Sequence, residues 1–300
     1  MAKSKLCLVL LLAASLWPGH AVAATPSGIT ISPFVQQITL QPTDVAKSFT
    51  VTLTNHTVSL QELHVTAQDF GSLNDTGGII LEGSNTYTRT YGLASWLSLP
   101  TDTVDLNPGE SQNLLVTIDN RSSLQPGGHY GAIVVSVNSL NQATGDKVLI
   151  NQQLTALVFV DKRGGEHYDL KLTEVKQNGN WLQLPSEVRV TFQNPGNVHV
   201  IPRGLVKLKS PSGRVLAQGV INSESALMLP ESYRQLYVPL SPVNKQLPLP
   251  GLYSLEVDYR YDGINQYATS SYLVRFIALK LDLAIVFLLA GGFWLWKRRP

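Results

Sequence analysis

The stretch VTFQNPGNVHV at residues 190–200 decides the fold, because a strand in it stops at an asparagine and a Pro-Gly turn follows at once. Nearly the same phrase occurs as VTLTN at 51–55 and as VTIDN at 116–120. A turn of the form Leu-x-Pro-x-acid precedes each of these two copies, LQPTD at 40–44 and LNPGE at 106–110. Such a turn feeds a strand, and the final asparagine tolerates a left-handed backbone and bonds its own backbone to start the next turn. The matching turns favour a repeated structural unit over a chance match.

Outward from these copies, most segments between the two ends of the chain alternate apolar and polar residues. In the strand that starts at Phe49, Val51 shares its face and threonines occupy the other face. Alternation with period two is typical of a half-buried strand. An Asn-Gly pair at 178–179 and an Asp-Gly pair at 262–263 separate neighbouring strands, as hairpin turns do. Many short strands with regular turns predict an all-β fold built from Ig-like β-sandwiches.

A charged, glycine-rich segment divides the chain into two predicted domains. DKRGGE at 161–166 follows the strongly apolar strand LTALVFV at 154–160. We therefore expect a linker at 161–166 between one Ig-like β-sandwich domain at 28–160 and a second at 167–276.

The N-terminus has the features of a secretory signal peptide at 1–24. Lys3 and Lys5 precede a short apolar run, and Ala-Val-Ala at 21–23 suits a cleavage site. The only cysteine, Cys7, lies inside this segment. An exported chain without cysteine must fold without disulfides, so its stability must come from its own core.

The C-terminus predicts one transmembrane helix at 277–296, because about 20 residues match a hydrocarbon layer about 30 Å thick. The basic tail at 297–300 is expected to stay in the cytoplasm. Snorkelling to the interface accounts for the two charges in the outer turn more simply than an ion pair inside the membrane. The residues assigned to this anchor are Lys280, Asp282, Trp294, Trp296, Lys297, Arg298 and Arg299. The sequence thus predicts a single-pass protein of the cell membrane with the bulk of its chain extracytoplasmic.

The charge of the exported part excludes nucleic acid as a partner. Residues 25–276 carry 17 basic and 20 acidic side chains, which give a formal charge of −3. The charges are scattered, and no basic run would attract phosphates.

Four segments give the chain a family resemblance. They are LNPGESQNLLVTIDN at 106–120, GGHYGAIVVSV at 127–137, NPGNVHVIPRG at 194–204 and LMLPESYRQL at 227–236. With the signal peptide and the basic-tailed anchor, the chain resembles the WxL-interacting surface proteins of Gram-positive bacteria. That resemblance implies a first domain that binds peptidoglycan and a second that binds a partner protein. Two tandem Ig-like domains also resemble the periplasmic pilus chaperones, which are soluble, so the predicted anchor argues against them.

No catalytic template fits the sequence. It lacks HExxH, GxSxG and P-loop motifs, and a Ser-His-Asp set assembled across domains is the alternative left open. Beyond the signal peptide the histidines have no metal-ligand spacing, and we interpret them as surface or sheet-face residues. These histidines are His56, His64, His129, His167 and His199. We therefore expect a protein that is not an enzyme and that has no cofactor and no metal.

Two kinds of short motif have simple explanations. LPLPG at 247–251 is similar to a sorting signal but lacks the threonine that a sortase would attack, so we interpret it as a proline-bounded turn. Glycosylation sequons start at Asn55, Asn74 and Asn120, and turn chemistry already accounts for the first and the third.

Two segments are candidates for ligand binding. Tyr87, Arg89 and Tyr91 lie in a polar, glycine-flanked stretch where aromatic rings and a guanidinium suit a sugar. The simpler alternative is that Trp96 and one tyrosine fill the sandwich core. His129 and Tyr130 lie in GGHYG at 127–131, where glycines permit either close approach of a ligand or a bulged strand entry, and we favour the bulge.

The leading functional hypothesis is a non-catalytic surface protein that binds cell-wall polymer or a surface protein partner. The alternative is a membrane-tethered, chaperone-like or assembly factor that works by β-strand addition, which needs backbone groups rather than a side-chain motif.

Overall fold

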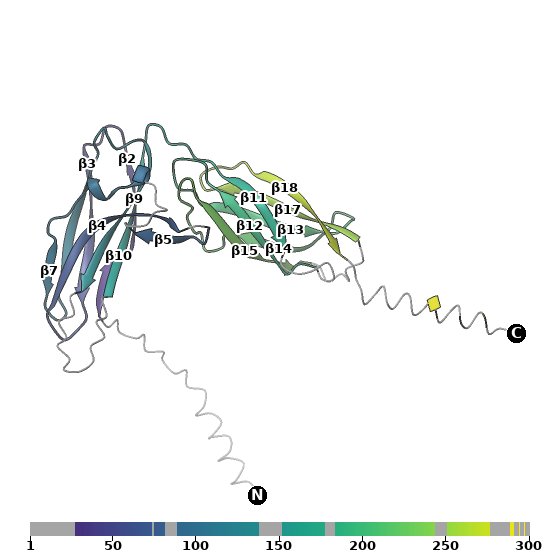
Figure 1. Cartoon of the computed structure of the whole chain (residues 1–300), viewed down its shortest axis with the longest axis horizontal. Coiled ribbons are helices and arrows are strands. Elements are labelled where there is room, and N and C mark those ends of the chain that lie inside the picture. The colour runs from purple at the N-terminus through teal and green to yellow at the C-terminus, as the bar shows by residue number, and fades with distance from the viewer. Residues whose placement is uncertain are drawn as a thin grey trace, which may run out of the picture.

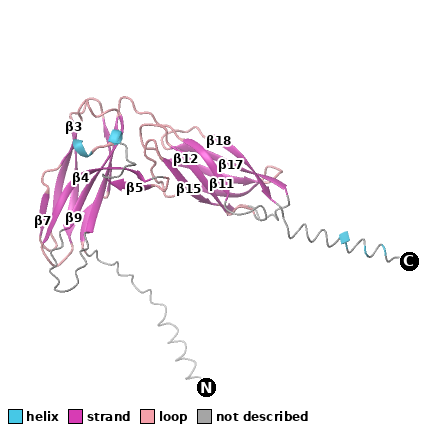
Figure 2. Ribbon diagram, in the orientation of Figure 1, coloured by secondary structure: helices cyan, strands magenta, loops and turns pink. Residues whose placement is uncertain are grey.

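The described part of the chain is all-β, as the alternating pattern predicts (Figures 1 and 2). Its strands form two β-sandwiches that follow each other along the chain, and β5 of the first sandwich points toward the second (Figure 1). The predicted signal peptide at 1–24 lies outside the described residues. The computed structural model describes residues 28–73, 75–81, 89–137, 152–177, 184–243, 251–276, 289–290, 294 and 297.

The first sandwich packs two sheets face to face, with strand orders β1-β3-β8-β6 and β2-β10-β9-β4-β5, and β7 pairs with the start of β4. Its strands are β1 (Ile29–Ser32), β2 (Val35–Leu40), β3 (Ala46–Asn55), β4 (Gln61–Leu73), β5 (Gly78–Leu81), β6 (Leu97–Ser98), β7 (Thr103–Leu106), β8 (Ser111–Asp119), β9 (Gly127–Val137) and β10 (Gln152–Lys162). Two short 3-10 helices, η2 (Arg89–Tyr91) and η3 (Ala94–Trp96), precede β6.

The second sandwich packs a three-stranded sheet, β11-β12-β15, against a five-stranded sheet, β16-β14-β13-β17-β18. Its strands are β11 (Lys171–Gln177), β12 (Glu187–Gln193), β13 (Pro202–Lys209), β14 (Val215–Ile221), β15 (Tyr233–Pro239), β16 (Ser241–Pro242), β17 (Gly251–Tyr261) and β18 (Ala268–Phe276).

Each sandwich has its own apolar core made by the inward side chains of its two sheets. Leu53, Val116 and Val158 are fully buried in the first core, and Val190 and Val257 are fully buried in the second. On each of these strands the neighbouring residues point to the opposite face, as period two requires. Neither core contains a disulfide, since a chain with a single cysteine cannot form one within itself.

The first residues of the fold change sheets. β1 pairs antiparallel with β3 in one sheet, whereas β2 pairs parallel with β10 in the other. Pro33 lies between them and has no N–H to donate, so it interrupts the ladder where the chain crosses over. As a result β2 reaches β10 only from Val35 onward.

The repeated asparagine has the turn-forming role that the sequence predicts. Asn55 and Asn194 are fully buried. In both residues, Nδ2 donates at 2.8 Å to the carbonyl four residues later. The same Nδ2 also donates to a distant carbonyl, which is that of Leu106 for Asn55 and that of Met228 for Asn194. Their Oδ1 atoms accept the N–H two residues later. The side chain therefore closes its own turn and ties that turn to a second loop.

The remaining details of the repeat differ from the prediction. Asn120 is only partly buried, and its Nδ2 donates to the carbonyls of Gln41 and Asp44 at 3.0 and 2.6 Å. Asparagine tolerates a left-handed backbone, but none of the three repeated asparagines adopts one. Among the described non-glycine residues, the left-handed positions are Asn222, Ser225 and Glu231 instead. Side-chain bonding, not backbone handedness, therefore explains the repeat.

The predicted membrane anchor requires correction. The span 277–296 lies mostly outside the described residues, which include only 289–290 and 294 of it. Within the described part of the chain, no helix is long and apolar enough to cross a membrane. That finding contradicts the predicted single-pass helix and the predicted place in the cell membrane.

Candidate partner-binding surface

One edge of β10 is only partly covered. The parallel partner β2 pairs with β10 from Val35 opposite Leu157 to Leu40 opposite Lys162. The other edge of β10 pairs with β9 over the full strand, from Gln152 to Lys162. Among the described residues, none pairs with the first edge at 152–156. We call these five residues of β10 the open edge.

The open edge presents backbone groups in a known direction. Leu157 donates its N–H to the carbonyl of Phe34 at 2.8 Å, so its peptide group points toward β2. Because peptide groups along a strand alternate in direction, those of Gln153 and Thr155 point the same way. These two residues therefore offer N–H and C=O groups to an added strand.

Apolar side chains border the open edge. Phe34, directly before β2, is 72% exposed. Leu154 points inward and is partly buried against the first core. A strand added at the open edge would cover both side chains, so hydrophobic burial would supplement its backbone hydrogen bonds.

An aromatic cluster lies where the two sandwiches meet. Phe70, Tyr130 and Phe159 project from the outer face of the β10-β9-β4 sheet, with ring centroids 5.3–5.8 Å apart. Leu229 and the ring of His199 pack on them from the second sandwich. We call these five residues the junction cluster.

A hydrogen-bonded pair inside the junction cluster joins the sandwiches. Tyr130 Oη accepts the backbone N–H of His199 at 2.8 Å and lies 3.3 Å from its Nδ1. Burial lowers the pKa of His199, because a low-dielectric site disfavours the imidazolium. Burial also raises the pKa of Tyr130 well above its usual value. Both side chains are therefore neutral at pH 7.

Acidification is expected to destabilise the fold through buried histidines. Burial lowers the pKa of His129 as well as that of His199. The unfolded chain takes up these protons near pH 6.5, whereas the folded chain does so only at lower pH. The two neutral histidines thus contribute fully to the free energy of unfolding above about pH 6.5. This contribution is lost as the pH falls below that value, by up to about 1.4 kcal/mol per histidine and pH unit.

Chemical denaturation between about pH 7.5 and 5.5 measures this effect on the free energy of unfolding. His199→Gln should flatten the pH dependence. His64→Gln is the matched control, because the His64 side chain is 45% exposed. A free energy of unfolding that does not change over this interval would contradict the prediction.

Glycines at the start of β9 allow the second sandwich to come close. Gly128 donates its N–H to the carbonyl of Asn197 at 2.7 Å. Gly127 has φ +126°, and a Cβ there would lie 2.9 Å from the same carbonyl oxygen. A bulge was expected here, but β9 pairs with β10 residue for residue through this segment. Close approach is the reason for the glycines, and what approaches is the chain itself.

Polar contacts complete the junction around the connecting segment. Asn197 Oδ1 accepts the N–H of His167 at 2.6 Å, and its Nδ2 donates to the carbonyl of Gly165 at 3.0 Å. Tyr168 donates its hydroxyl to Asp161 at 2.7 Å. These three hydrogen bonds lie on the short connecting segment at 161–168, and together they fix the orientation of one sandwich relative to the other.

A hairpin of the first sandwich reaches the second. The turn between β4 and β5 places the carbonyl of Asp75 2.9 Å from the N–H of Gln235, on the edge of β15. The side chains of these two residues are also hydrogen bonded. Figure 1 shows β5 next to the second sandwich. We call β4, β5 and their turn the bridging hairpin.

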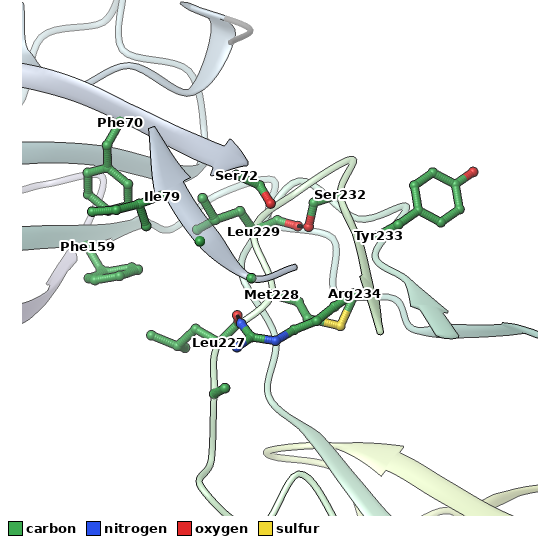
Figure 3. Close-up of a pocket in the computed structure, with 13 residues that line it drawn as sticks. Phe70, Ser72, Ile79, Phe159, Leu227, Met228, Leu229, Ser232, Tyr233 and Arg234 are labelled. Atoms are coloured by element: carbon green, nitrogen blue, oxygen red, sulfur yellow. Dashed lines mark hydrogen bonds between the residues drawn. The ribbon is translucent and has the colours of Figure 1, made fainter. Parts of the chain in front are cut away.

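A pocket of about 240 Å³ lies between the bridging hairpin and the second sandwich (Figure 3). Phe70 and Phe159 form one wall, and Leu227 and Leu229 form another. The side chain of Arg234 runs along its base (Figure 3). The pocket is therefore mainly apolar and contains one permanent positive charge.

Those predicted ligand residues that the structure describes make contacts within the chain itself. Tyr87 and the side chain of Arg89 lie outside the described residues. Tyr91 donates its hydroxyl to Glu231 of the second sandwich at 3.0 Å, and burial together with that carboxylate raises its pKa to about 12. Tyr130 belongs to the junction cluster. The hypothesis of a sugar-stacking loop therefore stays a prediction, since two of its three side chains lie outside the described residues.

The other predicted side chains have structural roles. His129 is 3% exposed, with Nε2 2.7 Å from the carbonyl of Gln125 and Nδ1 3.3 Å from that of Gly92. Trp96 packs against the first core, as the simpler interpretation of that segment predicts. In the described part of the chain, no group of three histidine, cysteine or acidic side chains could hold a metal ion.

Sequence reasoning missed the residues of the junction. His199 was placed on a sheet face, and Asn197, Glu231 and Arg234 were not singled out. The three glycines in GGHYG were the available signal, because they permit close approach. The sequence did not show that the approaching group would come from a second sandwich.

Comparisons with known proteins identify no family. No family model matches the chain, and no curated protein matches it. A chaperone–tip adhesin complex of CFA/I fimbriae aligns with 11% identity and a TM-score of 0.47, covering 82% of this chain and 98% of that one. The E. coli chaperone DraB aligns with 12% identity and a TM-score of 0.38, covering 81% and 98%. A Salmonella enterica complex of the SafA pilin with the SafB chaperone aligns with 8% identity and a TM-score of 0.39, covering 83% and 98%.

These comparisons overturn the resemblance to WxL-interacting surface proteins and leave peptidoglycan binding without support. The three structures named above are of chaperones, two of them in complex with a tip adhesin or a pilin. The motifs behind the resemblance are strand ends and turns, which any pair of Ig-like sandwiches can share. At TM-scores below 0.5 the likeness defines no function, so the function has to be inferred from the geometry.

Proposed function

We propose that the protein binds an extended segment of a partner protein by β-strand addition and acts without catalysis as a chaperone-like or assembly factor. The open edge of β10 carries this proposal. Its outward N–H and C=O groups at Gln153 and Thr155 are the groups that an added strand requires. The surface protein partner expected from the sequence fits this mode of binding.

The side chains at the open edge set the pattern of the partner segment. Leu154 faces the first core and Phe34 is exposed at one end of the edge. A segment with alternating apolar residues would cover Leu154 with one face and leave its other face toward solvent. Recognition then depends on the backbone groups of the partner segment and on its alternation of apolar and polar residues. Many sequences meet these two requirements.

Thr155→Pro tests the proposal. Proline removes the N–H that Thr155 turns toward the open edge and leaves the pairing of β10 with β9 intact, since that pairing uses the alternate residues. A photo-crosslinking residue placed at Gln153 of the full chain, in cells that export it, reports the partner. We expect crosslinks to a partner segment with alternating apolar residues, and at least a tenfold loss of these crosslinks in Thr155→Pro.

Thr155→Val is the matched control, because it keeps the N–H and the branched shape. A crosslinker at Thr50, exposed on the centrally placed β3 of the other sheet, controls for chance encounters. Equal crosslinking from Gln153 and Thr50, or crosslinking unaffected by Thr155→Pro, would rule out strand addition at this edge.

A further inference from the structure

We propose that the pocket between the sandwiches binds a small apolar carboxylate. Such a ligand consists of an aromatic ring or a branched aliphatic group that carries a short acidic arm. Arg234 would hold the carboxylate. This proposal does not depend on strand addition. The pocket lies toward the β4 side of the sheet, whereas the open edge lies on the far side of β10.

The walls of the pocket favour an apolar ligand body. Phe70 and Ile79 come from the bridging hairpin, and Phe159 comes from β10. Leu227 and Leu229 face them from the second sandwich (Figure 3). Phe70, Phe159 and Leu229 are already buried, so a ligand would mainly cover the apolar surface that Ile79 and Leu227 leave exposed, and such burial is the usual source of affinity in pockets.

Arg234 gives the pocket a positive charge without a close ion-pair partner. Its Nη1 donates to the carbonyl of Leu227 at 2.6 Å, but its buried Nε–H has no hydrogen-bond partner. In the described part of the chain, no carboxylate lies within ion-pair distance of Arg234. By contrast, Arg163 and Arg203 each have an acidic partner at 3.0–3.3 Å. Arg234 is half-buried and Glu224 acts on it only from beyond ion-pair distance, so an anionic group in the pocket would supply a close partner for the guanidinium.

The guanidinium is held in place before any ligand arrives. Gly77 in the turn of the bridging hairpin has φ +79°, and a Cβ at this position would overlap the guanidinium of Arg234. The backbone of the turn therefore lies directly on the planar group and limits its motion. A fixed fork of N–H donors suits a carboxylate, because both groups are planar.

The size of the pocket limits the ligand. An apolar cavity of about 150 Å³ accommodates benzene. The volume of about 240 Å³ here leaves room for one ring and a few more atoms. A monocarboxylate such as 3-phenylpropionate matches both this volume and the single positive charge.

The test uses 3-phenylpropionate as the probe and the neutral 3-phenylpropan-1-ol as its isostere. Titration of the full chain, followed by NMR chemical shifts, is expected to give saturable binding of the acid with a Kd on the order of 1 mM. Because a charge-assisted bond would be missing, the alcohol should bind about tenfold more weakly or not detectably. Arg234→Gln should remove this preference for the acid.

Two further variants keep the proposal testable if Arg234→Gln misfolds. Ala226→Phe fills the pocket without changing the charge and should abolish binding of the acid. Arg275→Gln removes an exposed arginine on β18 and should leave binding unchanged. Thr155→Pro should also leave it unchanged, which separates this proposal from strand addition. Equal affinity for acid and alcohol, or no saturable binding of the acid, would overturn the proposal.

Discussion

Replacing Tyr130 with alanine is expected to lower the free energy of unfolding by about 3–5 kcal/mol, the cost of truncating a buried aromatic side chain. Tyr130 is 1% exposed and packs against Phe70 and Phe159. Its hydroxyl also accepts the N–H of His199. The substitution thus removes ring packing in one sandwich and one of the hydrogen bonds to the other. We expect the angle between the sandwiches to vary in solution as a result.

Tyr130→Phe separates these two contributions. It keeps the ring but leaves the N–H of His199 without its acceptor, at a cost of about 1–3 kcal/mol. Denaturant titration measures the stability of both variants, and small-angle X-ray scattering measures the spread of the angle between the sandwiches. If alanine and phenylalanine had equal effects, ring packing would not be the principal contribution of Tyr130.

Replacing Asn194 with alanine is expected to cost about 3 kcal/mol or more. Its side chain makes three hydrogen bonds, to the carbonyls of Val198 and Met228 and from the N–H of Gly196. Alanine would leave these groups buried and unpaired. The bond to Met228 also holds the loop that supplies Leu227 and Leu229 to the pocket and the junction.

Asn120→Ala is the internal comparison for Asn194→Ala. Asn120 ends the second copy of the repeat, but it is partly exposed and its Oδ1 has no hydrogen-bond partner. The carbonyls of Gln41 and Asp44 that Asn120 bonds lie nearer to water than the carbonyls bonded by Asn194, so a loss of about 1 kcal/mol is expected. The denaturant midpoints of the two variants measure whether Asn194→Ala loses more stability than Asn120→Ala. Equal losses would mean that burial does not distinguish the copies of the repeat.

The strands and their inward faces could be predicted from the sequence for a physical reason. Period-two alternation, as at Phe49 and Val51, depends on neighbouring residues alone. The role of the asparagine was also predictable, because a side chain that bonds the backbone two and four residues later acts locally. Local patterns were therefore sufficient for the all-β fold.

The partner-binding surface could not be predicted in the same way. The open edge exists because β2 pairs parallel with β10 and does so only from Val35 onward. Register between strands more than a hundred residues apart leaves no local signal. The same holds for the contact between Tyr130 and His199, which are 69 positions apart. The family resemblance failed for a related reason, since its motifs describe turns and not the surfaces that bind.

β10 connects the open edge to the junction through a single uninterrupted strand. From Gln153 to Asp161 the backbone extends about 26 Å. Tension applied to a bound segment would pass along this strand, and the 11 residue pairs that join β10 to β9 would be loaded together in shear. The protein would therefore hold a pulled segment on a strand that resists in shear along its whole length, and the force would reach the second sandwich where Phe159 packs on His199.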